Sequence, residues 1–547
     1  MSKDSLVKGT VILAVAAFVA RALGLLQKVP LQYILGDEGL ATYGIAYSVY
    51  GMLLIVATAG IPSALSKMVS ERYALGRYAE ARRVYRAAVL FAAAAGIVSA
   101  ALLYAAAPWY AVHIAQDAHA VWSIRAIAPA LLMFPVIAIM RGYFQGRQMM
   151  IAGGMSQIVE QILRVGTAVG VAYAMLRLGY ENEYIAAGAS FGAVTGAAAA
   201  LAVMVFYEFK KRRMDRREGI DPARGDGETE SGGYPAIYRQ MLRLSIPISL
   251  ISLTVPVIFF IDSSTVIALL KDSIGYSAAK EALGILTGKA QSLAGIPPII
   301  AIALSTSIVP VISSAYARRD MREVNGKASE ALRIALLTGM PLAVILAVAA
   351  KPVIGFLFSD ANGWEIAAML TFSALFQVVM MASAAILMGL GQTLRPVGFV
   401  FAGLAVKLAG GYALAPLFGI YGIVGATLLA FVTIMLLNLR ELKKTVDYRM
   451  FGSRWPPFLA VSAALAAIGA ALAWYLDRWM DLGWPKAEFF LQSALLGVVL
   501  FALYPVLLIV LRVIRQEDVR MFPAPLRRLL APFLKLLSRS SRSFGEN

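Results

Sequence analysis

The chain has 547 residues, of which 60% are hydrophobic and 15% charged, and its formal net charge is +18. Soluble globular domains carry about 25% charged residues, so this composition excludes an ordinary soluble protein and predicts a polytopic membrane protein. The cations stand in short clusters between apolar runs rather than in a basic groove interleaved with aromatic residues, so we expect no nucleic-acid partner. The absence of cysteine excludes disulfides, thiolate catalysis and cysteine-ligated metal sites.

Apolar runs of about 20 residues recur along the chain without the alternating pattern of a β-barrel, so we expect helical spans. The predicted fold class is all-α, a polytopic membrane protein with about fourteen transmembrane helices. The first apolar run is too long for a signal-peptide core and is expected to be retained. The predicted helices cover residues 6–34, 41–66, 84–106, 121–143, 154–177, 184–208, 239–270, 283–314, 330–350, 364–390, 396–416, 420–440, 456–476 and 488–512.

The loops between these helices alternate in charge. Starting from a cytoplasmic N-terminus, the inside loops carry cations such as Arg82, Arg147 and Arg318, whereas the outside loops carry acids such as Asp37 and Glu181. Cytoplasmic loops of membrane proteins are enriched in lysine and arginine, so this alternation supports an even number of helices. We therefore expect both termini to be cytoplasmic.

Composition also predicts how the chain is divided. Residues 209–238 form a charged, glycine-containing stretch, which we interpret as a cytoplasmic linker between an N-lobe of six helices (1–208) and a C-lobe of six helices (239–440). A further pair of helices occupies 456–512. Residues 513–547 are predicted to form a basic amphipathic cytoplasmic tail that lies on the anionic lipids of the inner leaflet.

The two lobes share faint internal similarity. Pro62 aligns with Pro310 and Gln145 with Gln392, and the two offsets agree to within one residue. The offset between Gln145 and Gln392, applied to Glu160, places it opposite Lys407 of the C-lobe. Since each repeat holds an even number of helices, a pseudo-two-fold axis along the membrane normal would relate the lobes, as in many transporters.

Polar residues at bilayer depth are the candidates for a binding site, because charges there are costly and usually face a bundle interior or a watery cavity. Arg21, in the first span, either lines such a cavity or snorkels to the interface or pairs with a buried acid. We predict one set of substrate-binding residues and a second set that lines the cavity or couples ions. The first set is Arg21, Lys28, Lys289, Gln291 and Lys407, and the second is Asp262, Glu160, Arg164 and Gln157.

Charge pairing separates the members of these sets. Glu160 and Arg164 are four residues apart and can pair on one helix face, which favours a structural role. Arg21, Lys289 and Lys407 have no opposite charge at helical spacing, so they predict a cationic cavity suited to an anion, with arginine suited to phosphate oxygens. Asp262 either neutralises one of these cations or binds a coupling Na⁺ or H⁺, and we favour neutralisation.

No enzyme signature accompanies these residues. The sequence has no glycine-rich phosphate loop followed by lysine, and its two histidines, His113 and His119, lie outside the predicted spans. We therefore expect a transporter with no catalytic residue, no metal and no cofactor. Its driving force would be the membrane potential, a Na⁺ or H⁺ gradient, or the supply of substrate.

Several segments resemble a known group of carriers. The segments are LVKGTVILAVAAFVARALGLLQKVPL, LGDEGLATYGIAY, GIPSALSKMVSE, FFIDSST, GILTGKAQSLAGIPPIIAIALSTSIVPVISS and above all MRGYFQGRQMMIAGGMSQIVEQILRV. They are similar to the oligosaccharidyl-lipid flippases of the MOP superfamily, and most similar to the Gram-positive MurJ-type lipid II flippases and related stage V sporulation proteins. The resemblance implies an alternating-access carrier in the bacterial plasma membrane. It also implies a cationic cavity for an undecaprenyl-pyrophosphate-linked saccharide and a lipid-tail groove formed with helices 456–476 and 488–512.

Only some of the cavity cations of that group have charged counterparts in this sequence. Its first-helix arginine matches Arg21, and the second cation of that helix falls at Gln27 or Lys28, of which only Lys28 is charged. The arginine that the Gram-negative branch has in helix 2 falls near Leu54, which is apolar. Its arginine in helix 8 falls near Lys289 or Gln291.

Three functions fit these features unequally. The first is a flippase that moves a lipid-linked saccharide, lipid II being the expected form, from the inner to the outer leaflet, with the cell-wall synthesis machinery as a further partner. The second is a cation-coupled multidrug extruder of the same superfamily, which the cationic residue set disfavours. The third, a membrane enzyme acting on lipid-linked sugars, would need larger outer loops and catalytic acids.

Overall fold

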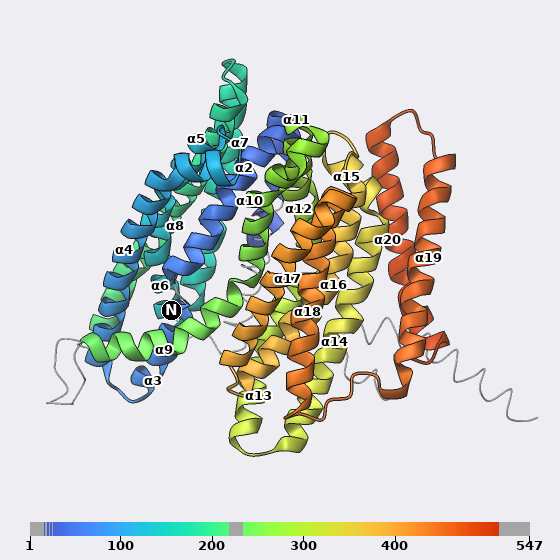
Figure 1. Cartoon of the computed structure of the whole chain (residues 1–547). Coiled ribbons are helices and arrows are strands. Elements are labelled where there is room, and N and C mark those ends of the chain that lie inside the picture. The colour runs from blue at the N-terminus through green and yellow to red at the C-terminus, as the bar shows by residue number, and fades with distance from the viewer. Residues whose placement is uncertain are drawn as a thin grey trace, which may run out of the picture. The chain divides into compact units, whose positions relative to one another are not determined.

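The structure is a computed structural model that describes residues 16, 19, 20, 22–24, 26–58, 60–217 and 234–513. Over these residues the chain is helical and contains no β-strand (Figure 1). Twelve helical segments in this part of the chain are long and apolar enough to cross a membrane. The predicted all-α membrane fold is confirmed.

The first half of the chain is built from long helices with short breaks. In order they are α2 (Lys28–Thr58), α3 (Ile61–Ala74), α4 (Tyr78–Trp109), the π-helix η1 (Tyr110–Ile114), α5 (Ala120–Ile127), α6 (Ala130–Gly146), α7 (Met150–Arg177) and α8 (Asn182–Arg217).

The second half contains more interruptions. Its helices are α9 (Tyr234–Ser252), α10 (Thr254–Ile274), α11 (Tyr276–Gly284), the π-helix η2 (Ile285–Ala290), α12 (Gln291–Ala294), α13 (Pro298–Ala317), α14 (Met321–Val348), α15 (Ala350–Leu357), α16 (Trp364–Gly389), α17 (Leu394–Phe418), α18 (Ile420–Lys443), the 3-10 turn η3 (Gly452–Arg454), α19 (Trp455–Trp479) and α20 (Pro485–Val510).

Two differences explain why twelve spans are found rather than fourteen. The predicted helices 6–34 and 41–66 meet at a kink rather than a loop, because Gly36 alone leaves the helical conformation, at φ 65°. Only glycine adopts that conformation without steric cost. The predicted helix 283–314 is instead broken into α11, η2, α12 and α13, and the Pro297–Pro298 pair accounts for the last break because neither residue has a backbone N–H to donate.

The predicted linker is only partly irregular. Helix α8 continues to Arg217 and α9 begins at Tyr234, so both ends of the stretch 209–238 are helical. Its centre, residues 218–233, lies outside the described residues, as do residues 514–547 of the predicted tail. The predicted helix 239–270 is also divided, with α10 beginning after Leu253.

The chain forms two compact units. Unit 1 comprises residues 1–292 and 393–430, and unit 2 comprises residues 293–392 and 431–547. Unit 1 thus holds the helices of the predicted N-lobe together with α9, α10, α11, η2 and α17. The division into lobes at 208 and 239 stays a prediction.

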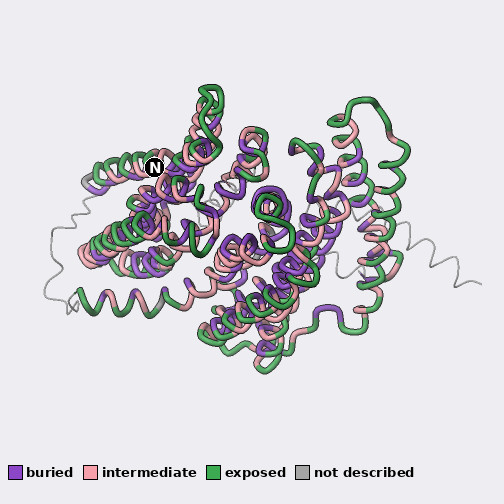
Figure 2. The backbone as a smooth tube through the Cα atoms, turned by 45° about the horizontal axis from the view of Figure 1, so that its top comes forward, coloured by how far each residue is buried: buried purple, intermediate pink, exposed green. Residues whose placement is uncertain are grey.

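Each unit has its own apolar packing. Unit 2 contains a continuous core along α14, α16, α19 and α20, whereas unit 1 has smaller clusters around Leu65 and Leu40. Figure 2 shows buried and exposed residues alternating along most helices. Many of the exposed side chains are large and apolar, for example Trp474 and Val498, as expected where helices face lipid.

Candidate functional site

Ion pairs between helices at bilayer depth lie in unit 1, within the part of the chain that the structure describes. They join α2, α6, α7, α10, η2 and α17. Charges in an apolar surrounding need a partner or a hydrated cavity, so the contacts of each group decide what it can do.

The first site is a one-to-one pair between α17 and α10. Lys407 Nζ lies 2.5 Å from Asp262 Oδ1, and both side chains are 1% exposed. The same ammonium donates to the carbonyl oxygen of Ile423 at 2.9 Å and to Thr427 Oγ1 at 2.7 Å. Lys407 has no opposite charge at helical spacing, but its partner lies on another helix, so the prediction that it is an unpaired cation of an anion cavity is wrong. The expected role of Asp262, neutralising a cation, is confirmed.

The second site joins η2 to the kink of α2. Lys289 Nζ donates to Asp37 Oδ2 at 2.8 Å, and the lysine side chain is fully buried. Gln32 Nε2 donates to the other oxygen of Asp37 at 3.3 Å. Lys289 is thus also paired, contrary to the sequence-based prediction, and neither buried lysine is a free cation of an anion cavity.

Small residues allow the backbone of α2 to approach closely the end of α11 and η2. A Cβ atom added at Gly284 would lie 1.7 Å from the carbonyl oxygen of Asp37, and one at Gly288 would lie 2.6 Å from Leu40 Cδ1. One added at Gly44 would meet Thr287 Oγ1 at 2.5 Å. The π-helical turn that carries Lys289 is a type of distortion often found at functional sites.

Lys28 differs from these two lysines. Its Nζ donates to the carbonyl oxygen of Thr287 at 2.6 Å, and no carboxylate pairs with it among the described residues. Among these residues, therefore, no acid cancels the positive charge of a protonated Lys28 at the start of α2. Arg21, seven residues earlier in the sequence, lies outside the described residues.

A third site, here called the arginine cluster, consists of Arg141, Glu160 and Arg164. Glu160 Oε2 accepts from Arg141 Nη2 at 2.7 Å, and Oε1 accepts from Arg164 Nη2 at 2.6 Å. Arg164 Nη1 also donates to the hydroxyl of Tyr47 at 2.8 Å. The predicted pairing of Glu160 with Arg164 is confirmed. Because two guanidinium groups share one carboxylate, the cluster keeps a net positive charge.

A fourth group lies around Asp117, in the segment between η1 and α5. Its buried carboxylate accepts from Lys280 Nζ at 3.0 Å, from the Tyr276 hydroxyl at 3.2 Å and from Thr42 Oγ1 at 2.7 Å. Burial, and secondly the nearby Asp117 carboxylate, raise the pKa of Tyr276. These bonds tie α2 and α11 to the segment before α5.

The remaining predicted residues are amides. Gln157 lies on α7, one turn before Gln161, and its Oε1 atom is buried without a hydrogen-bond partner among the described residues. Gln291 begins α12, and its Nε2 atom is likewise buried and without such a partner.

Sequence reasoning missed four charged partners: Asp37, Arg141, Asp117 and Lys280. Asp37 was interpreted only as an outside-loop acid, and the other three were not among the predicted site residues. The signal for Asp37 was its position directly after Gly36, the residue at which α2 is kinked. For Asp117 and Lys280 we find no local signal, because their pairing spans 163 residues.

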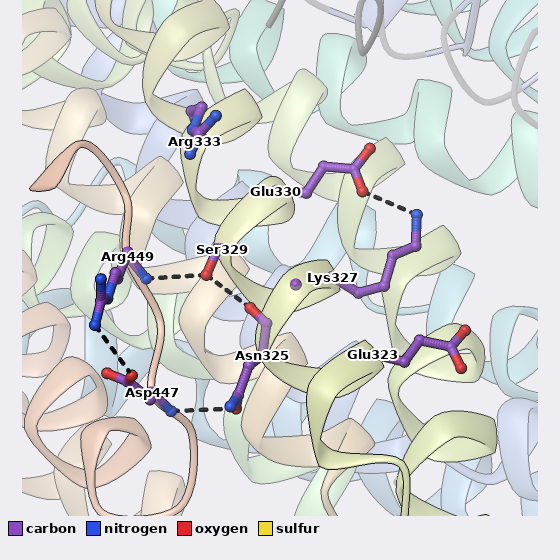
Figure 3. A pocket seen from close by; sticks show the side chains of 9 residues that line it. Glu323, Asn325, Lys327, Ser329, Glu330, Arg333, Asp447 and Arg449 are labelled. Atoms are coloured by element: carbon purple, nitrogen blue, oxygen red, sulfur yellow. Dashed lines mark hydrogen bonds and ion pairs between the residues drawn. The ribbon is translucent and has the colours of Figure 1, made fainter. Parts of the chain in front are cut away.

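Unit 2 contains an open polar pocket of about 550 Å³ near the start of α14 (Figure 3). Asn325 Oδ1 accepts from the backbone N–H of Asp447 at 3.2 Å, and Ser329 Oγ accepts from the backbone N–H of Arg449 at 2.9 Å. Lys327 pairs with Glu330 at 2.9 Å. Because its acids and cations occur in similar number, the pocket has no marked charge preference. No cluster of potential metal ligands occurs among the described residues.

Curated relatives of the chain are bacterial membrane proteins. The uncharacterized membrane protein YabM of Bacillus subtilis is 29% identical over 444 residues, covering 80% of both chains. The lipid II flippase MurJ of Bacillus subtilis is 26% identical and covers 86% of this chain and 89% of its own. The stage V sporulation protein B of the same organism is 26% identical, with coverages of 96% and 98%.

Solved structures show the fold. An inward-facing multidrug resistance MATE family transporter of the MOP superfamily matches with a TM-score of 0.63 at 15% identity, over 78% of this chain and 95% of that one. A MOP superfamily transporter from Pyrococcus furiosus matches with a TM-score of 0.58 at 16% identity, over 80% and 96%. The chain therefore has the MATE-like fold of MOP transporters. Residues 6–316 match the family described as polysaccharide biosynthesis protein, and the chain belongs to that family.

Proposed function

We propose that this multi-pass membrane protein is a flippase for an undecaprenyl-pyrophosphate-linked saccharide, with lipid II as its substrate. The observation that carries the proposal is the uncompensated charge of Lys28 in a chain of this family. The relative named lipid II flippase, with its high coverage of both chains, supports this substrate class.

In this mechanism, Lys28 and Arg21 bind the pyrophosphate. They are seven residues apart in the sequence, which is the spacing that places two side chains on one face where a chain is helical. A pyrophosphate oxygen can replace the carbonyl oxygen of Thr287 as the acceptor for Lys28 Nζ. Lys289 and Lys407 have a different role, since each is held by its own carboxylate and shapes the site rather than binding the anion.

The test is Lys28→Ala in a strain depleted of its own lipid II flippase and in proteoliposomes that hold a fluorescent lipid-linked saccharide. A hydrogen bond to a charged group contributes about 1.5–3 kcal/mol, so we expect flipping to fall roughly 10- to 100-fold. Lys28→Arg should keep most activity. Lys67→Ala, which removes a cation that is 65% exposed, is the matched control. Undiminished flipping by Lys28→Ala would contradict the proposed role.

The driving force follows from the paired acids. Glu160 and Asp262 are both held by cations, which favours the membrane potential over Na⁺ or H⁺ binding at either carboxylate. Flipping in proteoliposomes should therefore respond to a valinomycin-imposed K⁺ potential and remain unchanged by a Na⁺ gradient. Dependence on Na⁺ with no response to potential would overturn this assignment.

We also propose that both termini are cytoplasmic. Because the chain has no cysteine, single cysteines at its ends can be labelled without background. A membrane-impermeant maleimide should label them in inverted vesicles and leave them unlabelled in intact cells.

A further inference from the structure

Buried polar atoms without partners gather around the arginine cluster. Among the described residues, no hydrogen bond is made by the Tyr50 hydroxyl, by Oε1 of Gln157 or Gln161, or by Nε of Arg164. Leaving a buried polar atom unpaired costs about 1–3 kcal/mol, so such atoms in one neighbourhood call for an explanation. Lys407, by contrast, has three oxygen neighbours within 2.9 Å.

The four residues are neighbours in space. Gln157, Gln161 and Arg164 lie four and three residues apart on α7, so they share one helix face. Arg164 donates to the Tyr47 hydroxyl at 2.8 Å, and the ring of Tyr47 lies 5.8 Å from that of Tyr50.

This neighbourhood is also bordered by α6 and by the residues that precede α2. The ring of Phe134 on α6 lies 6.0 Å from that of Tyr50 and 5.3 Å from the guanidinium of Arg164. Gln161 Oε1 lies near Gly24, which precedes α2 in the chain. A Cβ atom added at Gly24 would lie 3.5 Å from this oxygen. The unpaired atoms therefore belong to one polar neighbourhood inside unit 1.

Their chemistry suits a sugar better than a phosphate. Two amide oxygens can only accept, the Arg164 Nε–H can only donate, and the Tyr50 hydroxyl can do both. Sugar hydroxyl and acetamido groups offer the matching donors and acceptors. A phosphate offers only acceptors, so it cannot satisfy the two amide oxygens, which need donors. The tyrosine rings add apolar faces against which a pyranose ring can pack.

We propose that Tyr50, Gln157, Gln161 and Arg164 form a subsite for the sugar headgroup, separate from the pyrophosphate contact at Lys28. The proposal rests on the proposed function and names the part of the substrate that α2 and α7 bind. Removing one of its hydrogen bonds should weaken only the contribution of the sugar to binding.

The experiment compares two ligands in nanodiscs that contain the full chain. One is undecaprenyl pyrophosphate, and the other is the same lipid carrying the N-acetylglucosamine–N-acetylmuramic acid disaccharide. We divide the dissociation constant of the sugar-free lipid by that of the disaccharide-carrying lipid. This ratio measures how much the sugar contributes to binding. Gln157→Leu, Gln161→Leu and Tyr50→Phe should each lower this ratio roughly 5- to 10-fold, since a net hydrogen bond is worth about 1 kcal/mol or more. Affinity for the sugar-free lipid should stay unchanged.

Two controls separate the outcomes. Gln377→Leu removes a buried glutamine from unit 2 and should change neither affinity. Lys28→Ala should weaken both ligands equally. The subsite is overturned if the three variants keep the wild-type ratio, or if they lose both ligands equally while their thermal unfolding midpoints stay unchanged. If the wild type binds neither lipid, the proposed function fails and the subsite falls with it.

Discussion

The Lys407–Asp262 pair and the arginine cluster both bury charge in unit 1, but they satisfy it differently. The pair is balanced one to one, and the lysine is further held by Ile423 and Thr427. The arginine cluster has two guanidinium groups for one carboxylate and unpaired polar atoms beside it. A closed pair is suited to fixing two helices, whereas a cluster with unused hydrogen-bonding capacity is suited to a ligand.

The largest expected effect comes from breaking the balanced pair. Lys407→Met leaves the Asp262 carboxylate buried without its cation, and removing one partner of a buried pair costs about 3–5 kcal/mol. We expect the free energy of unfolding in detergent to fall by that amount, as measured by circular dichroism. The double variant Asp262→Leu with Lys407→Met should recover most of the loss, because it removes both charges. An unchanged unfolding midpoint for Lys407→Met would contradict the closed-pair interpretation.

The arginine cluster should tolerate the matching change better. Arg141→Gln removes one guanidinium but leaves Glu160 paired with Arg164 at 2.6 Å. A hydrogen bond to a charged group contributes about 1.5–3 kcal/mol, so the loss should be smaller than for Lys407→Met. Arg177→Gln, at the exposed end of α7, is the control and should have almost no effect. If Arg141→Gln proved as damaging as Lys407→Met, the contrast between the two sites would be lost.

A third change tests the Lys289–Asp37 pair, which is closed like the first but depends on backbone fit. Gly284→Ala would place a methyl group 1.7 Å from the Asp37 carbonyl oxygen. Overpacking of this kind costs about 1–3 kcal/mol, and the unfolding midpoint should fall accordingly. Gly166→Ala on α7 is the matched control, because an added Cβ there meets no atom within 4 Å. Equal midpoints for the two variants would argue against close packing of α2 and η2.

The sequence predicted the charged pair within one helix but not the pairs between helices. Glu160 and Arg164 are four residues apart, and that spacing alone brings them together. Lys407 and Asp262 are 145 residues apart, and Lys289 and Asp37 are 252 apart, so nothing local links them. Counting charges at helical spacing therefore made two paired lysines look free.

The interruptions of the helices likewise depend on contacts between helices as well as on local sequence. A break near Gly36 was predicted, whereas the break at Pro297 was not, although proline has no N–H to continue a helix. Whether such a residue produces a loop, a kink or a π-helical turn depends on the neighbouring helix. Gly284 illustrates this dependence, because its lack of a side chain matters only through the Asp37 backbone opposite it.

By itself, the sequence determined that the chain is an all-helical membrane protein, because apolar length and the need to pair backbone groups within each span leave no other structure. It also indicated some of the residues that place charge at bilayer depth, such as Glu160, Arg164 and Lys407. Only the tertiary structure decided which of those charges are cancelled. In an apolar surrounding a charge is defined by the partner within about 3 Å of it, and that partner comes from a distant helix.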